Sequence, residues 1–403
     1  MSFVRLGNIA DIQLGKMLSP KSKTGTHYFP YLRNTNVQWG RFDLSELAQM
    51  NFSEREREKF ELRRGDLLVC EGGEPGRCAV WRGERADCYY QKALHRVRPH
   101  PAKADSEFLS RWIQHQAITG AFEDQNAKTT IAHLPLVRLE QLLIPDVGVA
   151  EQRRIAAHLK AQLAAVEQAR GSSQLLITEG EALRAAIYRE AYANIVPLSV
   201  PPDFIAPPAG WRWAKLKDVA RLESGHTPSR SRPDWWGGNI SWVSLTEIRA
   251  LDGRWVDETQ IRTNEAGIAN SAARVLPRGT VCYSRTASVG FVVIMGKPMA
   301  TSQDFANWVC GEQLDPEFLM HALIRSRKEL RSLATGATHK TIYMPALGSF
   351  HICMPKRKEQ ERIVGRLKQQ LAEVEIIQCE ARDRLAKIER LPAHLLAQVF
   401  GNV

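Results

Sequence analysis

Residues 151–166 read EQRRIAAHLKAQLAAV, and residues 359–374 read EQERIVGRLKQQLAEV. In both stretches apolar residues recur every three or four positions, which predicts a long amphipathic helix. The spacing lies between that of a coiled-coil seam and that of an ordinary amphipathic face. Such a helix is too long to bury its stripe inside a domain of about 150 residues. We therefore expect the two helices to pair with each other, antiparallel.

The predicted contact positions of this coiled coil are the apolar residues of the two stripes. They are Ile155, Leu159, Leu163, Val166, Leu176, Leu183 and Ile187 in the first helix, and Ile363, Leu367, Leu371, Val374, Ile377, Leu385 and Ile388 in the second. Gly171 and Gly180 interrupt the first stripe, which predicts fraying or a kink there.

The segments before the two helices also resemble each other. Shared landmarks occur in one order, at offsets between 208 and 214 residues: Val4–Ile12 with Ala214–Leu222, Arg64–Leu67 with Arg278–Val281, and Thr130-Ile131 with Thr341-Ile342. A single order at nearly one offset indicates two copies of one plan. In each copy, short apolar runs between Gly- and Pro-containing turns predict strands, and one helix is expected, over 106–121 and 316–333.

The predicted fold class is α+β, with two α/β globules in tandem repeat that are separated by two long helices forming an antiparallel coiled coil. The expected domains are a first globule (1–149), a central helix (150–194), a linker (195–210), a second globule (211–357) and a C-terminal helix (358–403). Five prolines between Pro197 and Pro208 make the linker stiff and end the preceding helix.

Composition narrows the class of protein. The 403 residues include 55 Lys and Arg against 44 Asp and Glu, a net charge of +11, and 44% are hydrophobic. Two folded domains are favoured over disorder, and most of the surplus charge lies in the globules, which suggests a polyanionic partner. The seven cysteines form no Cys-x-x-Cys pair and predict no metal site. Without an apolar stretch of signal-peptide length, a soluble cytoplasmic protein without a membrane role is expected.

Familiar enzyme signatures are missing. The chain contains no Gly-x-Gly, no Gly-Lys-Ser/Thr, no Asn/Asp-Pro-Pro-aromatic motif and no Glu-x-Lys. Dinucleotide enzymes, P-loop NTPases, DNA methyltransferases and nucleases of the Glu-x-Lys type are therefore disfavoured. We predict no catalytic residue and a non-catalytic role.

These features together resemble the DNA-specificity subunit of type I restriction-modification systems. The resemblance rests on Glu151–Ile155 after Leu-Ile-Pro145, on Glu359–Ile363 after Cys-Met-Pro355, and on Pro208-Ala-Gly-Trp211 before the second globule, and it covers essentially the whole chain. The first globule lacks the Pro-x-Gly-Trp sequence, and its proline lies two residues further from the helix motif.

The resemblance implies two target-recognition domains, each reading half of an asymmetric, bipartite sequence in double-stranded DNA. It implies that the coiled coil is a spacer and a docking surface for two modification (methyltransferase) subunits, which restriction subunits can join. It further implies no cofactor in this chain, with S-adenosylmethionine on the methyltransferase subunits, and ATP and Mg²⁺ on a restriction subunit where one exists.

Three pairs of polar segments are candidates for DNA contact, because reading bases requires donors and acceptors on loops that enter a groove. The candidates are Lys16, Lys21 and Lys23 with His226, Arg230 and Arg232; Lys128, Thr129, Thr130 and His133 with His339, Lys340, Thr341 and Tyr343; and the turn residues Arg77 and Arg285. The alternative is a set of solvated loops with incidental charge. Trp235 and Trp236 are interpreted as packing under a loop.

The functional prediction is a non-catalytic, sequence-specific DNA-binding subunit of a type I restriction-modification enzyme. Two alternatives stay open at this point. One is a two-lobed coiled-coil scaffold without DNA specificity, and the other is a self-sufficient DNA enzyme with an unrecognised site.

Overall fold

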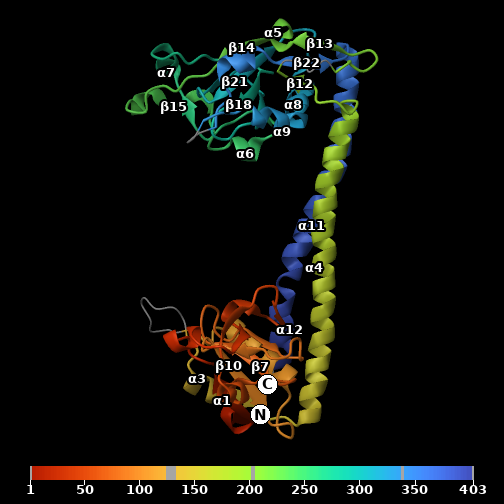
Figure 1. The fold of residues 1–403 in the computed structure, drawn as a ribbon. Helices are drawn as coiled ribbons and strands as arrows, with labels where there is room; N and C mark the ends of the chain where they lie inside the picture. Colours follow the sequence, from red (N-terminus) through yellow and green to blue (C-terminus); the bar gives the residue numbers. More distant parts are fainter. Residues whose placement is uncertain (1, 124–132, 201–204, 337–339, 402–403) are drawn as a thin grey trace. The chain divides into compact units, whose positions relative to one another are not determined.

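The computed structural model describes residues 2–123, 133–200, 205–336 and 340–401, and it divides into two compact units. Unit 1 comprises Met1–Gln174 and Arg382–Val403, and unit 2 comprises Leu175–Ala381. The long helices α4 (Val149–Ala191) and α11 (Arg357–Ile388) each contribute residues to both units. Each unit combines helices with β-sheets, so the predicted α+β fold is confirmed (Figure 1).

Unit 1 is built on a four-stranded antiparallel sheet. Its strands stand in the order β2 (Ala10–Leu14), β10 (Leu94–Pro99), β7 (Leu67–Cys70) and β8 (Cys78–Val80). Strand β7 is buried along its whole length. Leu67 and Val69 face the helix α2 (Ser106–Ile118), whereas Leu68 and Cys70 join the core under a second sheet. A strand buried on both faces lies between two layers, which explains its continuous apolar sequence.

The second sheet of unit 1 contains β6 (Ala48–Asn51), β3 (Tyr28–Leu32) and β9 (Tyr89–Tyr90), with β3 and β9 parallel. The remaining strand pairs are β1 (Phe3–Arg5) with β11 (Leu143–Pro145), and β4 (Val37–Gln38) with β5 (Arg41–Phe42). Short helices complete the unit: η1 (Leu6–Asn8), η2 (Pro20–Lys23), η3 (Asn34–Asn36), α1 (Glu54–Phe60) and α3 (Leu136–Glu140).

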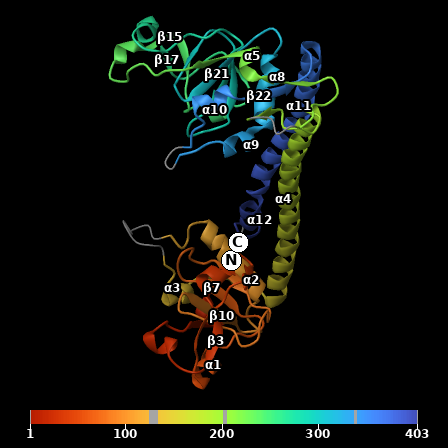
Figure 2. The same ribbon diagram turned by 45° about the horizontal axis from the view of Figure 1, so that its top comes forward.

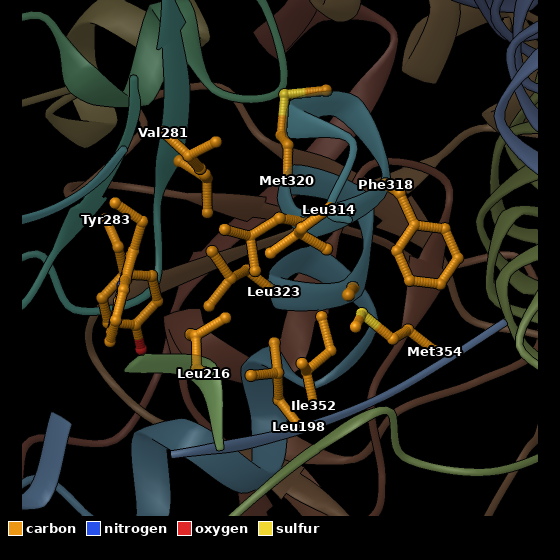
Figure 3. Packing of buried hydrophobic residues seen from close by; sticks show 14 of the residues in the cluster. Leu198, Leu216, Val281, Tyr283, Leu314, Phe318, Met320, Leu323, Ile352 and Met354 are labelled. Atoms are coloured by element: carbon orange, nitrogen blue, oxygen red, sulfur yellow. The ribbon is translucent and has the colours of Figure 1, made fainter. Parts of the chain in front are cut away.

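Unit 2 repeats this plan. Its main sheet has the order β14 (Ala220–Ser224), β21 (Phe305–Cys310), β18 (Val281–Ser284), β19 (Val292–Met295) and β16 (Trp255–Val256), and its second sheet has the order β17 (Arg262–Thr263), β15 (Trp236–Val243) and β20 (Ala300–Thr301). Helix α8 (Pro316–Arg325) packs on the main sheet. In Figure 3, Phe318, Met320 and Leu323 of this helix lie among Val281 and other apolar side chains of the core.

A third sheet of unit 2 includes part of the proline-rich segment. Its order is β12 (Leu198–Ser199), β22 (His351–Met354) and β13 (Arg212–Lys215). Leu198 is buried beside Ile352 in the core (Figure 3). The other helices are α5 (Leu216–Val219), η4 (Pro233–Trp235), α6 (Ile248–Leu251), α7 (Glu265–Ala269), α9 (Arg327–Ser332) and α10 (Met344–Gly348). The single helix expected over 316–333 is thus two helices, α8 and α9.

Within unit 2, α4 and α11 pack side by side (Figures 1 and 2). Arg184 pairs with Glu375 at 3.2 Å, and Glu190 pairs with Arg366 at 3.3 Å. As the residue number rises along α4, that of its partner on α11 falls. The predicted antiparallel pairing is therefore present in this unit.

The rotation of the two helices differs from the predicted stripe at its centre. Leu176, Leu183 and Ile377 are 38%, 49% and 48% exposed, so their assignment to the coiled-coil core was wrong. Gln378 occupies the contact instead: it is buried, and its Nε2 donates to the Ile177 carbonyl at 3.0 Å. The remaining predicted contact residues are buried or half-buried: Ile155, Leu159, Leu163, Val166, Ile187, Ile363, Leu367, Leu371, Val374, Leu385 and Ile388.

Gly180 explains why Gln378 occupies the contact between the helices. It also marks a second difference from the sequence prediction. A Cβ atom at Gly180 would lie 2.6 Å from Cγ of Gln378, so the missing side chain makes room for the glutamine. Helix α4 runs without a break through Gly171 and Gly180, and the predicted kink is absent. Contact with the facing helix offsets the conformational cost of glycine at position 180.

The C-terminal helix is two helices rather than the one expected over 358–403. Helix α11 ends at Ile388, and α12 (Leu391–Phe400) begins three residues later, with Pro392 in its first turn. Proline has no N–H for the carbonyl one turn earlier, so the α-helix breaks ahead of it. In unit 1, Phe400 of α12 packs against Phe108 and Trp112 of α2, with ring centroids 5.7 and 5.2 Å apart.

Candidate nucleic-acid interface

In unit 2 the polar turn after β18 is joined to the segment that precedes α10. The N–H of Ile342 donates to the carbonyl of Arg285 at 2.9 Å, and the N–H of Ala287 donates to that of Lys340 at 3.0 Å. Thr286 and Thr341 form an isolated bridge between these hydrogen bonds. Two of the three segments that the sequence singled out in the second globule therefore lie side by side.

The residues that follow β20 connect the third segment to these two. The guanidinium Nε of Arg285 donates to the carbonyl of Gln303 at 3.0 Å, and the Thr227 hydroxyl donates to Oε1 of the same glutamine at 2.5 Å. The backbone N–H of His226 donates to the carbonyl of Thr301 at 3.0 Å. Segments near residues 226, 285 and 341 thus meet around residues 301–304, and we call this group of loops the unit 2 loop edge.

Unit 1 brings the equivalent segments together in the same way. His133 forms a bridge with Gly72, and the N–H of Leu134 donates to the carbonyl of Glu71 at 2.7 Å. The N–H of Glu71 donates to the carbonyl of Ala93 at 3.0 Å, and the backbone N–H of Lys16 donates to the carbonyl of Tyr90 at 3.1 Å. The residues that follow β9 therefore join the segments near residues 16, 71 and 133, as those that follow β20 join their counterparts in unit 2. We call this group of loops the unit 1 loop edge.

Lys16 does not present its charge to solvent. Its ammonium donates to the carbonyl of Asn51 at 2.5 Å and to Glu56 at 2.7 Å, and it lies 4.8 Å from the ring centroid of Phe52. Although burial alone would raise it, the pKa of Glu56 is lowered by hydrogen bonds from Lys16 and Ser53. The predicted DNA contact of Lys16 is therefore corrected: the residue ties its loop to α1.

Arg77 is also engaged within the fold. Its guanidinium donates to Glu74 and to the carbonyl of Asn34, both at 2.9 Å, and its side chain is mostly covered. Arg285 is half-buried and holds the loop edge through Gln303. These two arginines position their loops within the fold, and their contact with DNA stays a prediction.

The other predicted contact residues fall into three groups. Exposed or half-buried at the loop edges are His133, His226, Arg230, Arg232, Lys340, Thr341 and Tyr343. Outside the described residues lie Lys128, Thr129, Thr130 and His339. Lys21 and Lys23 belong to η2, and their side chains likewise fall outside the description.

Tryptophan rings support the unit 2 loop between β14 and β15. Trp236 is half-buried and its Nε1 donates to the carbonyl of Ser229 at 3.1 Å. Trp235 lies under the guanidinium of Arg232, whose carbon is 4.8 Å from the ring centroid. Arg232 also forms two hydrogen bonds to Asp234, which lower the pKa of that carboxyl. Both tryptophans pack under the loop, as interpreted from the sequence.

Sequence reasoning missed two residues at the unit 2 loop edge. Gln303 joins two of the loops, and Arg249 reaches the Ser288 hydroxyl of the turn at 3.4 Å. Gln303 follows β20 at the same distance as Lys92 follows β9, so the internal repeat could have indicated it. Arg249 is the second residue of the short helix α6, and no sequence pattern marks it.

The described residues contain no group of three or more His, Cys, Asp or Glu side chains placed to hold a metal ion. Burial raises the pKa of Cys70 to about 11 and that of Cys78 to about 12, so these thiols stay protonated at neutral pH. None of the helices so described is both long and apolar enough to cross a bilayer.

Comparison with known proteins agrees with this architecture. The family model described as "Type I restriction modification DNA specificity domain" matches residues 1–174 and 208–389. The MjaIX type I restriction enzyme specificity subunit of Methanocaldococcus jannaschii is 25% identical over 159 residues, which are 39% of this chain and 37% of that protein. The HindI specificity subunit of Haemophilus influenzae is 26% identical over 133 residues, or 32% and 28% of the two chains. The alignments thus span about a third of these relatives.

Longer matches extend over nearly the whole chain. The StySPI specificity subunit of Salmonella potsdam is 20% identical over 389 residues, 93% of this chain and 82% of that one. Among solved structures, a chain from a study of type I R-M complex assembly and conformational transition has a TM-score of 0.75 at 20% identity, covering 99% of this chain and 97% of that one. The HsdS subunit of Thermoanaerobacter tengcongensis gives 0.61 at 20% identity, covering 99% and 96%.

Proposed function

The chain belongs to the type I restriction-modification DNA specificity family, and from this membership we propose that it selects the DNA sequence on which the methyltransferase subunits of such a system act. The chain itself is a specificity subunit, with no catalytic residue assigned to it. The observation that carries the proposal is the loop edge, which is built from the same three segments in both units. A protein that carries two such edges can read two separate stretches of a duplex.

The differences between the two edges support an asymmetric target. At equivalent positions, unit 1 has Lys16, bound to Glu56, and unit 2 has the exposed His226. Unit 2 adds a tryptophan-supported loop with Arg230 and Arg232. Different side chains at equivalent places favour different base sequences. The proposed target is therefore bipartite, with two unlike half-sites in double-stranded DNA.

The helix pair is the proposed docking surface for two modification subunits. Within unit 2, several apolar side chains of the two helices are exposed: Leu175, Leu176, Leu183, Ile376 and Ile377. In this proposal a modification subunit covers these side chains. In this proposal the complex acts in the cytoplasm, S-adenosylmethionine binds to the modification subunits, and a restriction subunit, where present, supplies the ATP- and Mg²⁺-dependent activity.

Methylation mapping tests the proposal. The chain is co-expressed with its modification subunits in a host without adenine methylation, and the genome is sequenced with base-modification detection. We expect methylation at one bipartite sequence, which is absent when this chain is omitted. Methylation without a shared sequence would favour the scaffold alternative. Methylation by the purified chain alone would favour the alternative of a self-sufficient enzyme.

A further inference from the structure

Arg230 rests in a corner formed by two indole rings of unit 2. Its guanidinium carbon lies 4.2 Å from the ring centroid of Trp236 and 5.1 Å from that of Trp242. The two rings meet edge to face, with their centroids 5.1 Å apart. A guanidinium attracted to the faces of aromatic rings loses much of its rotational freedom before any ligand arrives.

The corner itself is fixed by the fold. Trp242 is 2% exposed, and its Nε1 donates to the carbonyl of His226 at 3.3 Å. Trp236 opens strand β15, and its Nε1 donates to Ser229, the residue before Arg230. The loop and its platform are thus held to one strand. Because His226 and Thr227 belong to the unit 2 loop edge, Arg230 lies on that edge as well.

The hydrogen-bond donors of Arg230 are not used inside the described parts of the chain. Arg230 is exposed, and no carboxylate, carbonyl or hydroxyl of these residues accepts from its guanidinium. Arg232, two residues later, differs: Asp234 accepts from its Nε at 2.9 Å and from its Nη2 at 2.7 Å. One arginine of the loop is therefore satisfied internally, and the other is oriented but unpaired.

We propose that Arg230 determines specificity by reading a guanine in the half-site of unit 2, with two hydrogen bonds to O6 and N7. This inference rests on the proposed function. A planar guanidinium matches the two acceptors of guanine in the major groove, and this pairing is the commonest specific contact of arginine with DNA. A phosphate contact would need only a flexible cation. The indole corner favours base reading, because it orients the fork of donors in advance.

The test uses the full chain assembled with its modification subunits, bound to duplexes in which each half-site position is varied in turn. Arg230→Lys keeps the charge but loses the fork. We expect it to lower the preference for guanine at one position by roughly tenfold or more, and to leave other positions unchanged. Trp236→Leu should weaken the preference at the same position by less. Arg278→Lys is the matched control: Arg278 is also exposed and lies over an indole ring, that of Trp255, but it precedes β18 whereas the loop-edge turn follows that strand, so the change should alter no preference.

Several outcomes would overturn the inference. One is a wild-type motif without guanine in either half-site. Another is Arg230→Lys with wild-type preferences, while Arg230→Ala weakens binding equally at all positions, which indicates a phosphate contact. Unchanged affinity and unchanged base preference in both variants would also overturn the inference. A wild-type complex that selects no motif would instead refute the proposed function, and is recognised before any variant is measured.

Discussion

The side-chain oxygen of Gln152 accepts the backbone N–H of Asp105 at 2.9 Å, and Gln360 does the same for Asp315. The amide nitrogen of each glutamine donates to two further carbonyls, at distances between 2.8 and 3.1 Å. Asp105 and Asp315 cap α2 and α8. The repeated Glu-Gln-x-Arg-Ile sequence therefore fastens the start of a long helix to the first turn of the helix on the sheet.

Replacing Gln360 by Ala should destabilise unit 2 by about 2–4 kcal/mol, because one N–H and two carbonyls lose their buried partner. Urea unfolding monitored by tryptophan fluorescence provides the measurement. Glu359→Ala serves as the control: it removes an exposed pair with Arg362 in the same motif and should cost less than about 1 kcal/mol. Equal losses in the two variants would show that the buried glutamine has no special role.

The helix motif shows what the sequence could predict. Its apolar period is a local property, so the long helices and their antiparallel pairing followed from it. The rotation of the pair did not, because Leu176 and Ile177 are equally apolar and the choice between them depends on Gln378 fitting over Gly180. That fit involves residues about 200 positions apart in the chain, and periodicity within one helix carries no signal of it.

Gly180→Ala should destabilise unit 2, opposite to the usual effect of this change in a helix. Alanine normally stabilises a helix relative to glycine by about 0.5–1 kcal/mol, but here the new Cβ would overlap the side chain of Gln378. In a Gln378→Ala background the overlap is gone, and the same change should stabilise. Unfolding free energies of the four proteins in this cycle test the reversal of sign. Gly171→Ala, with open space around it, should stabilise in both backgrounds.

The three loop pairs were found from their polar sequence and their repetition. The sequence did not show which of their cations are exposed and which are enclosed by the fold. Lys16 and Lys340 look alike in sequence. Lys16 is enclosed by Asn51, Glu56 and Phe52, whereas Lys340 is exposed at the unit 2 loop edge. Partners such as Glu56 belong to a helix 40 residues away, so only the folded chain decides which lysine is free.

This contrast predicts separate effects for two alanine variants. Lys340→Ala should weaken DNA binding by the assembled complex without changing its melting temperature, and should lower the slope of log affinity against log salt by about one. Lys16→Ala should lower the melting temperature, because Glu56 and the Asn51 carbonyl lose a mostly buried partner. Salt titrations and thermal melts distinguish the two. The structure would be contradicted if Lys16→Ala lowered the salt slope while Lys340→Ala left it unchanged.

The stability of unit 2 should depend on pH through His321. Burial lowers the pKa of this imidazole to about 4, its Nδ1 meets the Tyr188 hydroxyl at 3.1 Å, and no described group is hydrogen-bonded to its buried Nε2. The unfolded chain, with an ordinary histidine pKa of about 6.5, binds a proton between pH 6.5 and 4 that the folded chain does not. The stability that unit 2 gains by keeping His321 neutral is therefore complete above pH 6.5, and it is lost as the pH falls toward 4.

The pKa difference corresponds to a loss on the order of 3 kcal/mol between pH 7 and pH 4. Urea unfolding of the full chain at pH 7, 6 and 5 should show stability falling with pH. His321→Gln should flatten this dependence, because glutamine can keep the contact with Tyr188 but does not titrate. His27→Gln, at an exposed site of unit 1, should keep the wild-type dependence. If His321→Gln retained the full pH dependence, protonation of this imidazole could not be its cause, and His95 and His115, whose pKa values burial also lowers, would be the next groups to replace.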